Sequence, residues 1–221
     1  MTIYKIELDN KRILQVAYKN INPDKMIIFL PGTSGNAMSE RFDYIDKIGL
    51  ETNHSVLRMD FQFQQYHDES LCIKDCVKDF ITVLEYIKHR DINTLKELIV
   101  IAKSFGCLVY HLSDVKANKA ILIAPYMHIK ENDLENMDYV NKKLSELKND
   151  ERYIKKELLK QNPHLILHGV RDKIMSIENS EKIANINNNY SIIRMDTDHS
   201  FNEEETQKKV IRESKKFLIN G

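Results

Sequence analysis

Short apolar runs alternate with longer segments of helical periodicity along most of this 221-residue chain, and this alternation limits the fold more than any other feature. Two early runs alternate apolar with polar residues around Asp9-Asn10-Lys11-Arg12, which predicts an antiparallel hairpin. The later runs are more continuously apolar, as expected of strands covered by helices on both faces. A hairpin followed by strand–helix repeats predicts an α/β fold with a mostly parallel, doubly wound sheet.

The expected elements follow directly from these patterns. We expect strands at residues 3–8, 13–18, 26–30, 55–59, 97–102, 119–124, 164–168 and 190–195. We expect helices at residues 71–90, 106–114, 176–187 and 202–218.

One segment, residues 127–161, interrupts this alternation. Its apolar residues recur at spacings of three and four, which predicts two amphipathic helices interrupted near Asn149-Asp150. The segment is longer than a simple crossover requires. Because single domains commonly contain about 100 to 250 residues, we expect one domain over residues 1–221 with a helical insertion at 127–161.

Composition excludes several classes of protein. The 33 basic and 33 acidic side chains balance, so no electrostatic footprint for nucleic acid or an anionic membrane is expected. The apolar stretches are far shorter than the ~20 residues that cross a bilayer, and the first ten residues do not resemble a secretion signal. The three cysteines include no CxxC spacing, and Cys72 and Cys76 are interpreted as packing residues on one helix face. We therefore expect a cytoplasmic protein without metal or cofactor; its oligomeric state is left open.

The residues after each parallel strand are the candidates for a site, because ligands gather at the carboxyl edge of such sheets. Ser104 follows the strand at 97–102 and precedes a helix, with the small residues Ala102 and Gly106 two positions away on either side. A tight strand-to-helix turn has room only for small residues there, and it would lift the Ser104 hydroxyl above the sheet.

Two more strand ends carry complementary groups. Asp172 follows the strand at 164–168, and His199 follows the last strand. A serine hydroxyl needs an imidazole to accept its proton, and the imidazole needs a carboxylate to orient it. Ser104, Asp172 and His199 stand in the chain order that an acyl-transfer triad takes on this architecture.

A fourth strand end supplies backbone donors. Residues 31–36 (PGTSGN) follow the strand at 26–30, and their glycines would let the Thr33 N–H point inward. Together with the Phe105 N–H at the start of the next helix, it could hold the oxyanion of a tetrahedral intermediate.

These four elements resemble those of the α/β-hydrolase superfamily. Residues 102–106 (AKSFG) resemble its nucleophile elbow, and residues 30–33 (LPGT) resemble its oxyanion-hole loop. Residues 168–172 (HGVRD) resemble its acid motif, and His199 lies where the family has its histidine. The resemblance implies the α/β-hydrolase fold, and it implies that residues 127–161 form a helical cap over the site.

The sequence departs from the family pattern at three positions. Ala102 replaces the usual first glycine of the elbow, and Pro31 replaces a common histidine before the oxyanion-loop glycine. Cys107 stands where a second glycine is frequent and is interpreted as a packing residue.

Other roles for these residues stay open. Ser104 could cap the following helix, and the carboxylate could instead come from Glu131 or Asp133 or, sideways, from Asp198. Lys103 is expected to be a solvated surface residue, although it could attract an anionic substrate. His168 is expected to be a core histidine. The remaining histidines are interpreted as structural or solvated: His54, His67, His89, His111 and His128.

The sequence thus predicts a serine hydrolase that cleaves a small carboxylic ester or thioester through an acyl-enzyme on Ser104. The alternatives are a peptidase or a carbon–carbon hydrolase with the same triad, or a binding protein on a hydrolase scaffold. Phosphate binding by residues 31–36 is disfavoured, since neither a phosphate-loop ending nor GxGxxG follows a strand.

Overall fold

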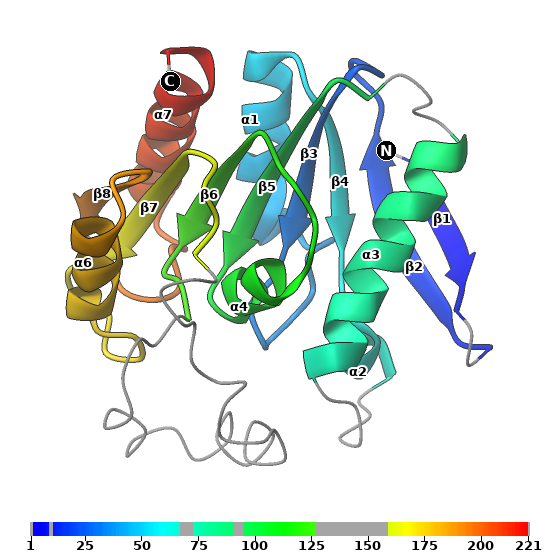
Figure 1. Ribbon diagram of the computed structural model, residues 1–221, viewed down its shortest axis with the longest axis horizontal. Coiled ribbons are helices and arrows are strands. Elements are labelled where there is room, and N and C mark those ends of the chain that lie inside the picture. The colour runs from blue at the N-terminus through cyan, green and yellow to red at the C-terminus, as the bar shows by residue number, and fades with distance from the viewer. Residues whose placement is uncertain (1, 9–10, 67–72, 91–94, 127–158, 221) are drawn as a thin grey trace.

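The computed structural model describes residues 2–8, 11–66, 73–90, 95–126 and 159–220, which form one eight-stranded sheet with helices on both faces (Figure 1). The strand order is β1-β2-β4-β3-β5-β6-β7-β8. The strands are β1 (Thr2–Glu7), β2 (Ile13–Lys19), β3 (Lys25–Leu30), β4 (Ser55–Met59), β5 (Glu97–Lys103), β6 (Lys119–Ile123), β7 (His164–Gly169) and β8 (Tyr190–Met195). The helices are η1 (Glu40–Phe42), α1 (Asp43–Thr52), α2 (Gln62–Tyr66), α3 (Ile73–Arg90), α4 (Phe105–Leu112), α6 (Ile177–Ile186) and α7 (Glu204–Asn220).

The pairing of the strands confirms the predicted mostly parallel sheet with an antiparallel hairpin. β1 and β2 pair antiparallel from Thr2 opposite Tyr18 to Glu7 opposite Ile13, and β2 also pairs antiparallel with β4. The pairs among β3, β4, β5, β6, β7 and β8 are all parallel. The sequence patterns do not single out α1 or α2, and α2 has only five residues, too few for its periodicity to be read.

Helices lie on both faces of the sheet, α1 and α7 on one and α3, α4 and α6 on the other (Figure 1). The central strands are therefore apolar along their length, and residues 26–30 of β3 are fully buried. Successive residues of β3, β5, β6 and β7 alternate between two hydrophobic cores, one on each face of the sheet. This explains why short continuous apolar runs were a reliable sign of the parallel strands.

The registers of the parallel strands bring their carboxyl ends together. Leu30 at the end of β3 lies opposite Ala102 of β5, so the loop after β3 starts beside Ser104. Gly169 at the end of β7 lies opposite Met195 at the end of β8, so the loops after these two strands are neighbours. The predicted site residues are thus placed along one edge of the sheet.

A helical cap is expected at residues 127–161. Of these, residues 127–158 lie outside the described residues, and only 159–161 are described. The cap and the single-domain boundaries at 1–221 stay predictions. Within the described ranges, the helices are too short or too polar for any of them to be a membrane span.

A cluster of buried aromatic and imidazole rings lies near the start of β7. The His164 ring stacks on Tyr190 at 4.1 Å between ring centroids, and His111 Nε2 lies 2.9 Å from the Tyr190 hydroxyl. Tyr110, the Lys160 ammonium and the Asn162 carbonyl also lie beside the His164 ring. Burial lowers the pKa of His164 to about 4 and that of His111 to about 3, so both rings are neutral at pH 7.

Replacing His164 with phenylalanine should make the free energy of unfolding less dependent on pH below neutrality. The unfolded imidazole takes up a proton near pH 6.5, whereas the folded one stays neutral down to about pH 4. The free energy of unfolding of the wild type should therefore fall between these pH values, and that of His164→Phe should fall by on the order of 2 kcal/mol less. Urea unfolding at pH 7, 5.5 and 4 measures the difference; parallel curves would contradict the buried neutral state.

Candidate active site

Ser104 has a left-handed backbone, with φ 49° and ψ −116°, in the turn from β5 into α4. The turn is fixed by the last residues of β6 and by Tyr126, since the Ser104 N–H donates to Ile123 O at 2.9 Å and the Tyr126 N–H donates to Ser104 O at 3.1 Å. A side-chain carbon at Gly106 would lie 2.5 Å from Leu30 O, so only glycine fits there. This is the strained turn that the small residues around Ser104 predict.

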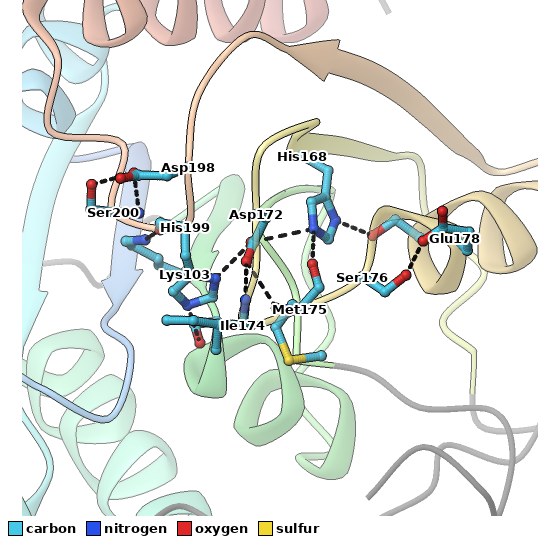
Figure 2. Close-up of polar contacts among 12 residues, drawn as sticks. Lys103, His168, Asp172, Ile174, Met175, Ser176, Glu178, Asp198, His199 and Ser200 are labelled. Carbon is cyan, nitrogen blue, oxygen red and sulfur yellow. Dashed lines mark hydrogen bonds and ion pairs between the residues drawn. The ribbon is translucent and has the colours of Figure 1, made fainter. Parts of the chain in front are cut away.

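The structure brings Ser104, His199 and Asp172 together. His199 Nε2 lies 3.0 Å from Ser104 Oγ, and His199 Nδ1 lies 2.7 Å from Asp172 Oδ2. Figure 2 shows the His199 ring facing Asp172. Because an ionised carboxylate only accepts hydrogen bonds, Nδ1 carries the ring proton, which leaves Nε2 free to accept one from the Ser104 hydroxyl. The His199 side chain is 17% exposed and the Asp172 side chain is fully buried.

The Asp172 carboxylate is held by several donors at once (Figure 2). Its Oδ1 accepts the backbone N–H groups of Ile174 at 2.9 Å and Met175 at 2.8 Å, while its Oδ2 accepts from His199. Burial alone would raise the pKa of Asp172, but the hydrogen bonds from His168, His199 and Met175 outweigh it and hold the pKa well below its usual range. The carboxylate is therefore ionised at neutral pH.

His168 is the core histidine that the sequence predicts. It is fully buried in β7, with Nε2 2.9 Å from Met175 O and Nδ1 2.6 Å from Ser180 Oγ. Because a carbonyl only accepts, Nε2 carries the proton, and the same N–H faces Asp172 Oδ2 at 3.4 Å. His168 thus supports the carboxylate from the side opposite His199.

Among the described residues, neither Asp198, the alternative considered from the sequence, nor the nearby Asp196 bonds to the His199 ring. The Asp198 carboxylate accepts from the Ser200 backbone N–H at 2.8 Å and from the Ser200 hydroxyl. Asp196 pairs with Arg171 at 2.9 Å. Glu131 and Asp133 lie outside the described residues.

The expectation that Lys103 is a solvated surface residue is wrong. Lys103 is only 7% exposed, its Nζ donates to the backbone carbonyl of His199 at 2.5 Å, and it lies over the Phe201 ring. The turn at Ser104 directs this side chain into the space between β5 and the loop after β8, which the sequence pattern could not reveal. Burial lowers the pKa of Lys103 to about 8, although the nearby Asp172 raises it.

The two predicted backbone donors border the same cavity as Ser104 and His199. The cavity has a volume of about 710 Å³, and Thr33 and Phe105 line it together with the aromatic residue Tyr126. Neither the Thr33 nor the Phe105 N–H donates a hydrogen bond to another described residue. Both N–H groups are thus unpaired within the described residues, as donors to a ligand in the cavity must be.

Neither the Cys107 thiol nor a cluster of metal-ligating side chains forms a second reactive site among the residues that the structure describes. Cys107 is fully buried with Sγ 3.2 Å from Ala102 O, and burial raises the pKa of its thiol, so it is a packing residue. The described side chains include no group of three or more histidine, cysteine or carboxylate residues that could hold a metal ion.

Comparison with solved structures relates the fold of this chain to known proteins. Est1E from Butyrivibrio proteoclasticus superposes with a TM-score of 0.74 at 17% identity, covering 98% of this chain and 97% of that one. The Pyrococcus furiosus esterase Pf2001 gives a TM-score of 0.75 at 19% identity, covering 98% and 89%. A thermophilic esterase, Est2, from Thermogutta terrifontis gives 0.73 at 16% identity, covering 96% and 91%.

No protein-family model matches this chain, and no curated protein matches it. Sheet order, helix layers and structural neighbours together define the α/β-hydrolase fold, as the resemblance of the motifs implies.

Replacing Asp172 with asparagine should destabilise the protein at neutral pH. The amide cannot replace a buried carboxylate that accepts from His199, His168 and two backbone N–H groups, so we expect a loss of about 1 to 3 kcal/mol at pH 7. Because the folded pKa is depressed, the wild-type advantage should shrink as the pH falls below about 4.

Urea unfolding at pH 7 and pH 3 checks this prediction. Asp196→Asn is the control, because that carboxylate is exposed and its loss should change stability by less than about 0.5 kcal/mol. Equal effects of the two substitutions at pH 7 would contradict the role of Asp172 as a buried acceptor.

Proposed function

We propose that this chain is a serine hydrolase that cleaves small carboxylic esters or thioesters, with Ser104 as nucleophile, His199 as general base and Asp172 as the orienting carboxylate. The observation that carries the proposal is the relay from Asp172 Oδ2 through His199 to Ser104 Oγ, at 2.7 and 3.0 Å. Both distances lie within the range for proton transfer along hydrogen bonds.

Acylation starts when Ser104 Oγ attacks the substrate carbonyl and passes its proton to His199 Nε2. Asp172, kept ionised by its donors, stabilises the imidazolium that forms and keeps the ring in place. His199 then gives this proton to the leaving alcohol or thiol, which departs and leaves an acyl ester on Ser104.

Deacylation uses the same groups in the same order. His199 Nε2 takes a proton from a water molecule, which attacks the acyl ester, and returns the proton to Ser104 Oγ as the acid leaves. In both halves the carbonyl oxygen becomes negative. The N–H groups of Thr33 and Phe105 are our candidates for holding it, and one such donor typically contributes about 3 to 4 kcal/mol to the transition state.

Lys103 adds a second support for the base. Its ammonium holds the backbone carbonyl of His199, so the loop that carries the imidazole is tied to the residue next to the nucleophile. This contact limits how far His199 can move from Ser104 during turnover.

The choice of ester substrates rests on the structural neighbours. One solved structure of Est1E holds ferulic acid, and the Est2 structure holds butyrate. Both ligands are small carboxylic acids, and the cavity of about 710 Å³ at Ser104 can take ligands of this class. A peptidase or a carbon–carbon hydrolase would use the same triad.

A binding protein on a hydrolase scaffold is the alternative from another class. The hydrogen-bonded geometry of all three side chains and the strained backbone at Ser104 favour an enzyme, since binding alone requires neither. The cytoplasmic location stays a prediction from the sequence.

Ser104→Ala should abolish hydrolysis and labelling by a fluorophosphonate probe while leaving the melting temperature nearly unchanged. Loss of the nucleophile removes the covalent route, so kcat should fall by at least about a thousandfold. Ser191→Ala on the exposed face of β8 is the matched control and should keep full activity. A Ser104→Ala protein that retains most of its activity would refute the proposed nucleophile.

A substrate screen should place the activity on esters or thioesters. We expect turnover of p-nitrophenyl esters of graded chain length or of acyl-CoA thioesters, measured as released p-nitrophenol or thiol. Peptide amides should react much more slowly, because an amine is a poorer leaving group. Turnover of peptides alone would replace the proposed substrate class with that of a peptidase.

A further inference from the structure

The side chain of Gln64 in α2 forms hydrogen bonds with the loop that follows β3. Its Nε2 donates to Gly32 O at 2.6 Å and lies 3.3 Å from Thr33 O, while its Oε1 accepts the Phe61 N–H at 2.9 Å. A carbonyl can only accept and a backbone N–H can only donate, so the orientation of the amide is fixed by its partners. None of the sequence motifs includes Gln64.

The peptide that Gln64 holds borders the nucleophile. A side-chain carbon at Gly32 would lie 3.2 Å from Ser104 Cβ and 3.7 Å from Ser104 Oγ. The absence of a side chain at this position leaves room between the loop and the nucleophile. The peptide between Gly32 and Thr33 is therefore part of the wall around Ser104.

Peptide geometry couples the contact of Gln64 to the donor at Thr33. The Gly32 carbonyl and the Thr33 N–H belong to one trans peptide, so they point in opposite directions. The Gly32 carbonyl accepts from Gln64 and also from the Gly35 N–H at 3.1 Å. Fixing the carbonyl toward these two donors fixes the N–H toward the other side.

We infer that Gln64 is a positioning residue that aims the Thr33 N–H at the oxyanion of the reaction. The inference rests on the proposed function and extends it to a residue that does not itself touch the substrate. Gln64 also polarises the Gly32–Thr33 peptide, because a donor on the carbonyl makes the N–H of the same peptide a stronger donor. The contact thus helps when negative charge develops on the substrate oxygen.

The helix that carries Gln64 is itself anchored. The Asp79 carboxylate of α3 accepts the Gln62 backbone N–H at 2.8 Å and the Gln62 Nε2 at 2.6 Å, all in a buried environment. This attaches the start of α2 to the body of the protein. Gln64 therefore positions the loop from a fixed support.

The next residue of α2 provides a matched control. Gln65 exchanges two hydrogen bonds with the backbone of Gln15 in β2, from Gln15 N to Oε1 at 3.1 Å and from Nε2 to Gln15 O at 2.9 Å. It has the same side chain on the same helix and also binds backbone, but it contacts a different strand, β2. Substitutions at Gln64 and Gln65 separate loop alignment from a general effect on α2.

The test compares Gln64→Glu with Gln65→Glu in the full-length protein. At neutral pH the new carboxylate cannot donate to Gly32 O and repels it. For Gln64→Glu we expect kcat on a p-nitrophenyl ester to fall about 10- to 100-fold with KM within about threefold, somewhat less than complete loss of one oxyanion donor. Gln65→Glu should keep kcat within about twofold.

A tetrahedral inhibitor gives a readout that a merely structural role would not move. A trifluoromethyl ketone forms an adduct with an oxyanion, so its affinity for Gln64→Glu should fall by about the same factor as kcat/KM. The affinity for the free carboxylic acid product should change little. If Gln64→Glu does not fold, Gln64→Met has a similar length and cannot donate, and the same results are expected of it.

Two outcomes would overturn the inference in distinguishable ways. If the wild type hydrolyses the ester but the Gln64 and Gln65 variants have equal kcat and inhibitor affinity, Gln64 does not position the donor and the proposed function stands. If the wild type hydrolyses no ester or thioester and Ser104 is not labelled by a fluorophosphonate, the proposed function fails and the inference fails with it.

Discussion

The left-handed backbone at Ser104 is the constraint on which the rest of the site depends. With φ at 49°, the chain leaves β5 and enters α4 within one residue, which raises the serine hydroxyl above the sheet. This turn is possible only because Gly106 lets α4 approach the carbonyls of Leu30 and Pro31. Hydrogen bonds from the Ser104 backbone to Ile123 and Tyr126 stabilise this strained conformation. Residues of β3, β5 and β6 therefore all contribute to the position of the Ser104 hydroxyl.

A second set of constraints brings the partners of Ser104 to the same edge. The register of β7 against β8 places the loop of Asp172 beside the loop of His199. Buried donors keep Asp172 ionised, and Lys103 ties the His199 backbone to the neighbourhood of the nucleophile. Geometry and charge therefore both support the proposed transfer of the Ser104 proton to His199 Nε2.

Much of this arrangement could be predicted from the sequence, and the reasons are physical. Buried parallel strands need continuous apolar runs, and the elbow needs small residues at 102 and 106, so both leave local marks. The structural neighbours bear out the predicted fold, whereas the roles of Ser104, Asp172, His199, Thr33 and Phe105 stay predictions that the distances support.

Contacts between distant segments could not be predicted from local sequence patterns. The expectation of a solvated Lys103 was wrong because its burial depends on the loop at 199–201, nearly a hundred residues away. Gln64 is one of two adjacent glutamines in a five-residue helix, and only the folded chain distinguishes the one that faces Gly32 from the one that faces Gln15. Local patterns therefore locate the groups that would react, but not the groups that hold them.

The central claim is that Ser104 forms a covalent acyl intermediate. Rapid quenching of the protein with a p-nitrophenyl ester, followed by proteolysis and mass spectrometry, tests it most directly. The account predicts a burst of p-nitrophenol close to one equivalent and an acyl group on the peptide that contains Ser104. Product formation with no acyl group on that peptide, or with the acyl group on Cys107 or Lys103 instead, would contradict it.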